Sequence, residues 1–294
     1  MKKYNNPVGV SRFTGLLLIS PFIAGSILFI IYPFVCSFIT GLTRYDNIHS
    51  PEFIGLENYR KMLTDRSFLK AVGVTFRYTA IFVPLKIIVS LFAAMLLSVS
   101  IKGIGVYRTV FYIPSILGSN LAVVIMWQYL FTRDGLVNQF LGILGLSPVS
   151  WYGDKHYTIF IIVLLRLWEF GSTMIIFLTA VRNIPKEYYE AARVDGCGSI
   201  RAFFSITLPL IKNTVFINVI LQTISALQEF NAPYMITGGS PMKSTYTIGM
   251  LIYDEMFSYN NAGYANAVSW ILFVLTAAII YIMFRIGKKR SDLL

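Results

Sequence analysis

The chain has 294 residues, of which 56% are hydrophobic and 13% are charged. Soluble domains carry about 25% charged residues, so this composition excludes a soluble protein and indicates an integral membrane protein. The net charge of +11 would suggest a nucleic-acid partner in a soluble protein. Basic cytoplasmic loops and anionic membrane lipid account for it here, so we expect lipid and no nucleic acid among the partners.

Six apolar stretches are long enough, at about 20 residues, to cross the hydrocarbon core as helices. They cover residues 15–42, 71–98, 106–131, 158–181, 212–229 and 265–286. Their continuity favours helices over a membrane barrel, whose strands would alternate. The first stretch lacks a small-residue cleavage site, so we interpret it as an uncleaved helix and not as a signal peptide. The sequence thus predicts an all-α protein with six transmembrane helices.

The Lys and Arg residues of the connecting segments predict the orientation. With the first, third and fifth loops outside, the inside segments carry more Lys and Arg than the longer outside segments. We therefore expect both termini, and the loop of residues 182–211, in the cytoplasm.

The sequence offers no catalytic or metal-binding set. Cys36 lies in the first apolar stretch and Cys197 in a predicted cytoplasmic loop, so they cannot meet as a disulfide, and His49 and His156 have no metal-ligand spacing around them. The stretch GGSPMKS at 238–244 resembles a phosphate-binding loop but lacks the glycine before its lysine and a preceding strand. We expect no metal and no cofactor on this chain, and no enzymatic activity.

Polar residues follow one face of the fifth stretch. Thr214, Asn218, Gln222, Ser225 and Glu229 are spaced i, i+4, i+8, i+11 and i+15, which places them along one side of a helix. Such residues either line a water-filled substrate path or hydrogen-bond to neighbouring helices. We favour the path.

Other charges lie within the apolar stretches. Arg166 and Glu169 are three residues apart and can meet on one helix face as a structural pair. Lys86, which follows Pro84, could contact substrate or pair with an acid across the bundle. Trp127 and Trp168 fit an interfacial aromatic belt, with stacking on a sugar ring as the alternative.

The charged segment 182–211 predicts an angled pair of helices. Pro185 suits the first turn of a helix over 187–195, and Gly196 can adopt the left-handed conformation that ends many helices. Ser199 is the expected N-cap of a second helix over 199–205.

This pair carries small and apolar residues that suggest a docking surface. Ala191 and Ala192 share a face and would let another backbone approach closely, and the second helix carries Ile200, Phe203 and Phe204. The alternative is a loop that packs only under its own bundle.

The same segment resembles a known family. The EAA motif of permease subunits in binding-protein-dependent ABC importers is matched in full spacing by Glu190-Ala191-Ala192, Gly196, Ile206 and Leu208-Pro209. Residues 53–63, 107–117, 126–141, 183–192 and 235–241 are similar to carbohydrate-uptake permeases of the maltose-porter F-type or glycerol-phosphate A-type, so the resemblance covers the whole chain.

The resemblance implies the type I importer transmembrane fold in the cell membrane. It divides the chain into a leading helix and external loop (1–70), a permease domain (71–286) and a cytoplasmic tail (287–294). It also implies four kinds of partner: a second permease, two ATPase copies that bind ATP and Mg²⁺, an extracytoplasmic binding protein, and a sugar or polyol.

The family's site residues transfer to this chain by their motifs. The coupling loop would meet the ATPase through Glu190, Ala191, Ala192, Arg193, Asp195 and Gly196, and the binding protein would meet Thr237, Gly238, Gly239 and Pro241. The candidates for the substrate path come from the polar, charged and aromatic residues described above and not from the resemblance; they are Asn218, Gln222, Ser225, Glu229, Trp127, Trp168 and Lys86.

Two other classes of function compete with the importer. An ion-coupled secondary carrier could use Lys86, Arg166, Glu169 and Glu229, but it would generally show internal repeats and leave the EAA loop unexplained. A membrane scaffold or receptor would leave the polar face of the fifth stretch unexplained.

Overall fold

The computed structural model describes residues 12–99, 102–118 and 120–291. The described part is almost wholly helical, with one antiparallel strand pair, β1 (Thr43–Arg44) and β2 (Glu52–Phe53). The chain ends at 1–11 and 292–294, for which the sequence predicts a cytoplasmic location, lie outside the described residues.

Three continuous helical segments are long and apolar enough to cross a membrane: Gly15–Gly41, Arg66–Leu97 and Ala262–Gly287. The first combines α1 (Arg12–Ser26), a π-helical segment η1 (Ile27–Ile31) and α2 (Tyr32–Gly41). The second is α4 (Arg66–Leu97), and the third belongs to α16 (Ala262–Ser291).

The remaining apolar stretches form bent pairs of helices. The bends are 98° between α5 (Ile104–Leu117) and α6 (Leu121–Leu130), 50° between α8 (Lys155–Trp168) and α9 (Gly171–Arg182), and 72° between Ser199–Leu210 and α13 (Lys212–Leu227). The described residues thus hold three helices that could span a membrane by length and composition, or up to six spans if each bent pair is one. The stretches 106–131 and 158–181, each predicted as one helical span, are therefore each a bent pair of helices.

Short elements connect these segments. They are α3 (Glu57–Met62), α7 (Leu136–Ile143), α10 (Lys186–Val194), α11 (Ser199–Ala202), η2 (Phe203–Thr207), α12 (Leu208–Leu210), α14 (Asn231–Thr237), α15 (Ile248–Tyr253) and η3 (Asp254–Ser258). Several helix starts are fixed by side-chain caps: Asp65, Asn120 and Asp154 accept backbone N–H bonds at the beginnings of α4, α6 and α8.

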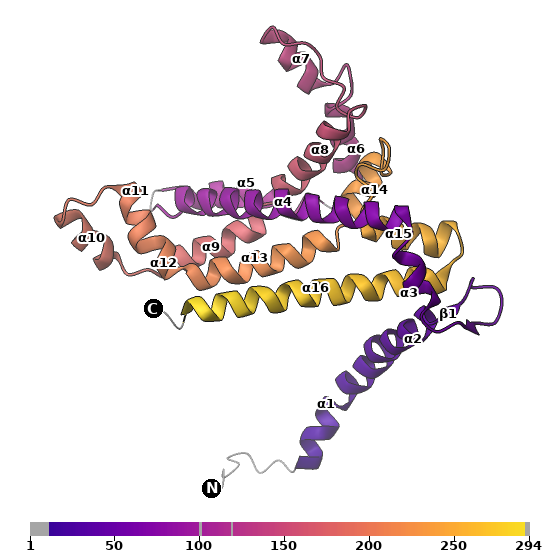
Figure 1. Ribbon diagram of the computed structural model, residues 1–294. Coiled ribbons are helices and arrows are strands. Elements are labelled where there is room, and N and C mark those ends of the chain that lie inside the picture. Colours follow the sequence, from indigo (N-terminus) through magenta and orange to yellow (C-terminus); the bar gives the residue numbers. More distant parts are fainter. Residues whose placement is uncertain (1–11, 100–101, 119, 292–294) are drawn as a thin grey trace.

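The long helices define two ends of the molecule (Figure 1). α4 packs against α9 and α13, and α16 packs against α2 and α13. α10 and α11 lie at one end of these helices, which we call the α10 end; α3, α15 and the strand pair lie at the other, the α15 end. α7 and α1 project away from the body on different sides.

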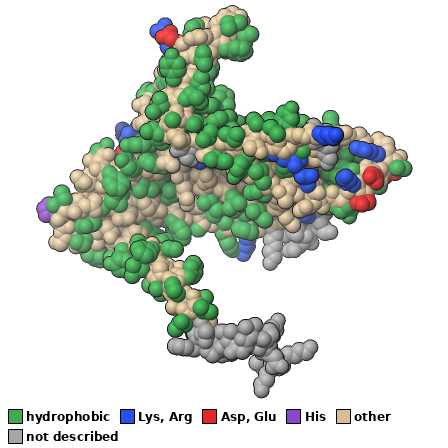
Figure 2. Space-filling model, turned by 180° about the vertical axis from the view of Figure 1, so that it is seen from behind, with side chains coloured by type: hydrophobic (Ala, Val, Ile, Leu, Met, Phe, Trp, Pro, Cys, Tyr) green, Lys and Arg blue, Asp and Glu red, His purple; other side chains and the backbone are tan. Residues whose placement is uncertain are grey.

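The kinds of side chain on the surface differ from one part of the molecule to another. Figure 2 shows apolar side chains over much of one face and a group of Lys and Arg side chains near the α10 end. No residue in the apolar window of the first span is fully buried. One side of α2 packs against α16, and the remaining side chains of the span are left for contacts outside this chain. The basic end is the one for which the sequence predicts a cytoplasmic location.

Candidate functional site

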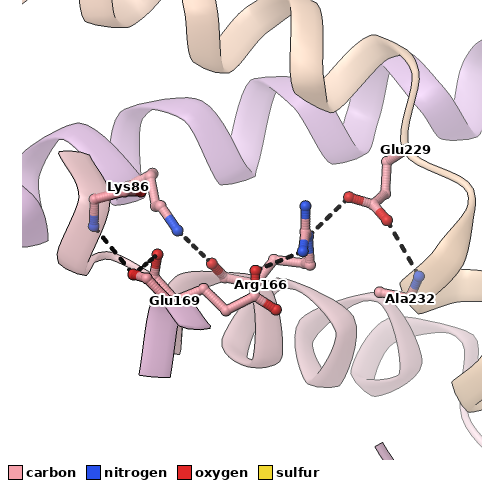
Figure 3. Close-up of polar contacts among 7 residues, drawn as sticks. Lys86, Arg166, Glu169, Glu229 and Ala232 are labelled. Carbon is pink, nitrogen blue, oxygen red and sulfur yellow. Dashed lines mark hydrogen bonds and ion pairs between the residues drawn. The ribbon is translucent and has the colours of Figure 1, made fainter. Parts of the chain in front are cut away.

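A network of charged side chains lies inside the bundle (Figure 3). Arg166 Nη1 is 2.5 Å from Glu169 Oε2, and Arg166 Nε is 2.8 Å from Glu229 Oε2. The second contact is an ion pair without the linear geometry of a hydrogen bond. The structure confirms the Arg166–Glu169 pair predicted from the sequence. The link to Glu229 was missed, although opposite charges in two apolar stretches were its available signal.

Burial makes this pairing necessary. The Arg166 and Glu229 side chains are only 22% and 5% exposed, and an isolated charge in such an environment is costly. Lys86, also buried, does not pair with an acid as one expectation had it: its Nζ donates to the backbone oxygen of Arg166 at 2.6 Å.

The same region satisfies the backbone at the bend between α8 and α9. A helix end leaves carbonyl groups without partners in their own helix. Lys86 Nζ donates to Arg166 O, and Ser115 Oγ donates to Glu169 O at 2.9 Å. Ser90 Oγ donates to Phe170 O at 3.4 Å. Side chains from α4 and α5 therefore support this bend.

The predicted polar face of α13 divides into buried and exposed parts. Asn218 is buried and donates to Thr214 O at 2.9 Å, and Gln222 Nε2 donates to Thr173 Oγ1 of α9 at 3.1 Å. Ser225 is exposed, whereas Glu229 is buried in the charged network. Gln222 and Glu229 on this face therefore contact neighbouring helices, whereas the Ser225 side chain remains exposed.

Trp127 and Trp168 lie against each other, with ring centroids 6.2 Å apart and planes at 29°. Trp127 Nε1 donates to Ile161 O at 3.2 Å, and both rings pack on the central core. A nearby cavity of about 20 Å³ has room for about one water molecule. Ligand sites generally measure about 300–1,000 Å³, so this cavity does not hold a sugar. Its lining is Gly118, Val124, Leu165, Arg166, Glu169, Asn231, Ala232 and Met235.

The segment after α9 forms the expected helix pair at the α10 end. Gly196 has a positive φ of 73°, and Cys197 N donates to Ala192 O at 2.8 Å, which closes the end of α10. Two details differ from the sequence prediction. Pro185 is the N-cap residue of α10, and Ser199 is the first residue of α11, whose N-cap is Gly198 without a side-chain hydrogen bond.

The helix pair is open to solvent or to a partner. No residue of α10 is buried, and Val194 and Ile200 are 88% and 78% exposed. Tyr189 Oη lies 2.8 Å from Thr207 Oγ1, which ties α10 to η2. The predicted coupling residues Glu190, Ala191, Arg193, Asp195 and Gly196 are exposed, and Ala192 is half-buried.

The predicted binding-protein loop lies at the α15 end. Thr237 ends α14 and accepts a hydrogen bond from Gly239 N at 3.2 Å, while Gly238 is exposed, Pro241 half-buried and Gly239 buried. Lys70 Nζ donates to Met242 O, which links the loop to α4.

Beside this loop, burial and the neighbouring Asp254 carboxylate raise the pKa of Tyr246 above its ordinary value of 10. Tyr246 donates to Asp254 Oδ2 at 2.7 Å. The phenol therefore stays protonated and keeps its hydrogen bond at physiological pH.

Two amide side chains that the sequence analysis did not single out, Asn138 of α7 and Gln128 of α6, make several hydrogen bonds to backbone carbonyls. Asn138 Nδ2 donates to three carbonyls, those of Thr132, Arg133 and Val149, and its Oδ1 accepts from Trp151 Nε1 at 3.0 Å. Gln128 Nε2 donates to two carbonyls of α14. Lone amides of this kind show no pattern in the sequence.

Within residues 12–99, 102–118 and 120–291, no group of three or more His, Cys, Asp and Glu side chains could hold a metal ion.

Comparison with known proteins places the chain in a family. Residues 86–289 match the family described as "Binding-protein-dependent transport system inner membrane component". The chain is 38% identical over 289 residues to the probable ABC transporter permease protein YesP of Bacillus subtilis, covering 97% of this chain and 93% of that protein.

A second relative and a solved structure agree with this match. The trehalose/maltose transport system permease protein MalF of Thermococcus litoralis is 34% identical over 282 residues, with 95% of each chain covered. The fold is similar to a chain in the crystal structure of a bacterial ABC transporter involved in the import of the acidic polysaccharide alginate, with a TM-score of 0.79, 20% identity, and 94% and 96% of the two chains covered. The chain therefore belongs to the family of binding-protein-dependent transport system inner membrane components.

Proposed function

We propose that this chain is one of two permease subunits in an ATP-driven importer of a sugar or related polyol. The family places it in the membrane as a transport component that depends on a binding protein. The sugar class is supported by relatives such as the trehalose/maltose permease.

The observation that carries the proposal is the exposed helix pair at the α10 end. It offers apolar Val194 and Ile200 beside the small residues Ala191 and Ala192, with no covering element in the described chain. Each of two ATPase copies would bind one such pair, here and on the second permease, in the cytoplasm. Both termini of this chain would lie on that side, and ATP and Mg²⁺ would be bound by the ATPases, with no cofactor on this chain.

The substrate path would run along α13, between this chain and the second permease. Exposed Ser225 belongs to it, with Gln222 at its edge and Asn218 and Glu229 supporting it from the interior. A sugar does not fit the cavity beside the network, so the second permease would supply the facing wall. Lys86, Trp127 and Trp168 are engaged within the chain, which favours a role in shaping the path.

The binding protein would meet the loop of Thr237, Gly238, Gly239 and Pro241 at the α15 end, where Gly238 is exposed, Thr237 and Pro241 are half-buried, and Gly239 is buried and supports the loop. Residues 71–286 would form the permease domain. Residues 1–70, in which the apolar window of the first span has no fully buried residue, would add a lipid-facing or partner-facing arm, and residues 287–294 a tail.

Uptake by membrane vesicles containing the chain and its partners tests this function. Uptake of a sugar that the binding protein selects should require ATP and should stop when the ATPase is removed. Uptake driven by an ion gradient alone would contradict the proposal and favour a secondary carrier.

A further inference from the structure

Three helices, α6, α8 and α14, are joined to the body by the α5–α6 bend, the α8–α9 bend and the turn between α13 and α14. We call these three helices the unit. α14 packs against both α6 and α8. Gln128 of α6 donates to Met235 O and Ile236 O of α14 at 2.7 and 3.1 Å, and Trp127 of α6 donates to Ile161 O of α8. Side chain to backbone bonds thus tie the three helices together. α5, α9 and α13 pack with α4 in the body, and α8 also packs against α4, so α8 is the helix through which the unit rests on the body.

The three connections that join this unit to the body lie close to the side chains of Arg166, Glu169 and Glu229. At the first, a Cβ on Gly118 would overlap the Glu169 side chain, so the end of α5 lies directly against that acid. At the second, Arg166 of α8 pairs with Glu169, the C-cap residue of α8 at the start of the bend. At the third, Glu229 accepts a hydrogen bond from Ala232 N at 3.1 Å and so fixes the start of α14.

Arg166 contacts both acids that take part in these connections, Glu169 and Glu229. It comes from α8 in the unit, and its two carboxylate partners lie at the bend and just after α13 (Figure 3). A guanidinium presents several donors in a rigid plane, so it can hold two carboxylates in a fixed mutual position. A lysine at the same place would keep the charge but lose this geometry.

We propose that Arg166 is a positioning residue for transport, which holds α6, α8 and α14 as a single body on the rest of the chain. The contacts of Arg166 with Glu169 and Glu229, which we call the charged junction, are separate from the bonds inside the unit. Loss of Arg166 should therefore loosen the unit from the body and leave its internal bonds intact. The inference goes beyond the permease assignment, since it depends only on contacts within this chain.

Distances between spin labels test this in the full chain with Cys36 and Cys197 replaced by serine. One label pair, at Ile125 of α6 and Tyr157 of α8, lies within the unit; another, at Tyr157 and Ile217 of α13, crosses the junction. All three side chains are exposed. The variants are Arg166→Gln and Arg166→Lys, with Arg77→Gln as control, since the exposed Arg77 forms no ion pair within the described residues.

Arg166→Gln should shift or broaden the distance across the junction and leave the distance within the unit unchanged. Arg166→Lys should give a narrower distribution across the junction than Arg166→Gln, and Arg77→Gln should behave as the parent chain. If Arg166→Gln does not fold, Glu229→Gln gives the same test, because a glutamine oxygen can still accept from Ala232 N. An unchanged distance across the junction, or equal broadening of both distances, would overturn the proposal.

Discussion

Arg166 of α8 and Glu229, which follows α13, form an ion pair of 2.8 Å inside the bundle. The pair joins two broken spans, and Glu229 also caps α14 through Ala232 N. Removal of one partner from a buried pair leaves an uncompensated charge and generally costs about 3–5 kcal/mol.

Substitutions at Glu229 should therefore separate the ion pair from the cap. Glu229→Ala removes both and should lower the thermal midpoint more than Glu229→Gln, which keeps an acceptor for Ala232 N. Thermal unfolding of the purified chain in detergent shows which of the two variants has the lower midpoint. Equal midpoints for the two variants would show that the cap contributes nothing.

Gly118 and Gly105 offer a matched comparison within one region. A Cβ at position 118 would overlap Glu169, whereas a Cβ at position 105 meets nothing within 4 Å. Gly118→Ala should destabilise the protein by about 1–3 kcal/mol, the usual cost of overpacking. Gly105→Ala should be neutral or stabilising by up to about 1 kcal/mol, because Gly105 lies in the first turn of α5 and alanine restricts the unfolded chain more than glycine does. Unfolding midpoints in the reverse order would contradict the packing of Glu169 on Gly118.

Gly196→Val should weaken association with the ATPase while the chain still inserts in the membrane. No atom crowds this glycine, so the effect comes from its positive φ of 73°, which costs a β-branched residue about 1–3 kcal/mol. Co-purification of the ATPase measures it. Gly198→Val is the control, because Gly198 has an extended conformation and equal space.

Glu190→Lys tests the same surface through charge. The side chain is exposed, so its replacement should leave folding intact and reduce co-purification of the ATPase. Unimpaired co-purification with both Glu190→Lys and Gly196→Val would refute the coupling assignment.

Gln222→Ala and Asn218→Ala test the path along α13. Both should alter the KM or the maximal rate of sugar uptake with assembly intact, Gln222→Ala more strongly because its side chain is closer to the open face. Ser269→Ala in α16, whose hydroxyl bonds only within its own helix, is a polar control without expected effect. Unchanged kinetics in both α13 variants would assign these amides to helix packing.

The sequence predicted local features better than the convergence of distant ones. The helix pair around Gly196 follows from a glycine, short-range charges and apolar spacing, all within one loop. Ser199 was misplaced by one position because Gly198 adopts the extended cap conformation without a side-chain bond. Serine is a frequent cap, but local preference does not decide which neighbour begins the helix.

The sequence did not predict the bends within the apolar stretches or the ion pair between Arg166 and Glu229. Apolar stretches 106–131 and 158–181 are long enough for single helices, and only tertiary contacts reveal the breaks. At Gly171, a Cβ would lie 2.7 Å from Phe111 O, so close approach of α9 to α5 requires the glycine. The partner of Glu229 likewise depends on which helix faces it, which hydropathy does not specify.

Cross-linking from α10 to the ATPase tests the central claim most directly. A chain with Cys36 and Cys197 replaced by serine would carry one cysteine at Ala191, exposed at the α10 end, or at Met242, exposed at the α15 end. In the assembled importer, we expect Ala191→Cys to cross-link to the ATPase and Met242→Cys to cross-link to the binding protein. Cross-links from Ala191→Cys to the binding protein, or from Met242→Cys to the ATPase, would contradict the account.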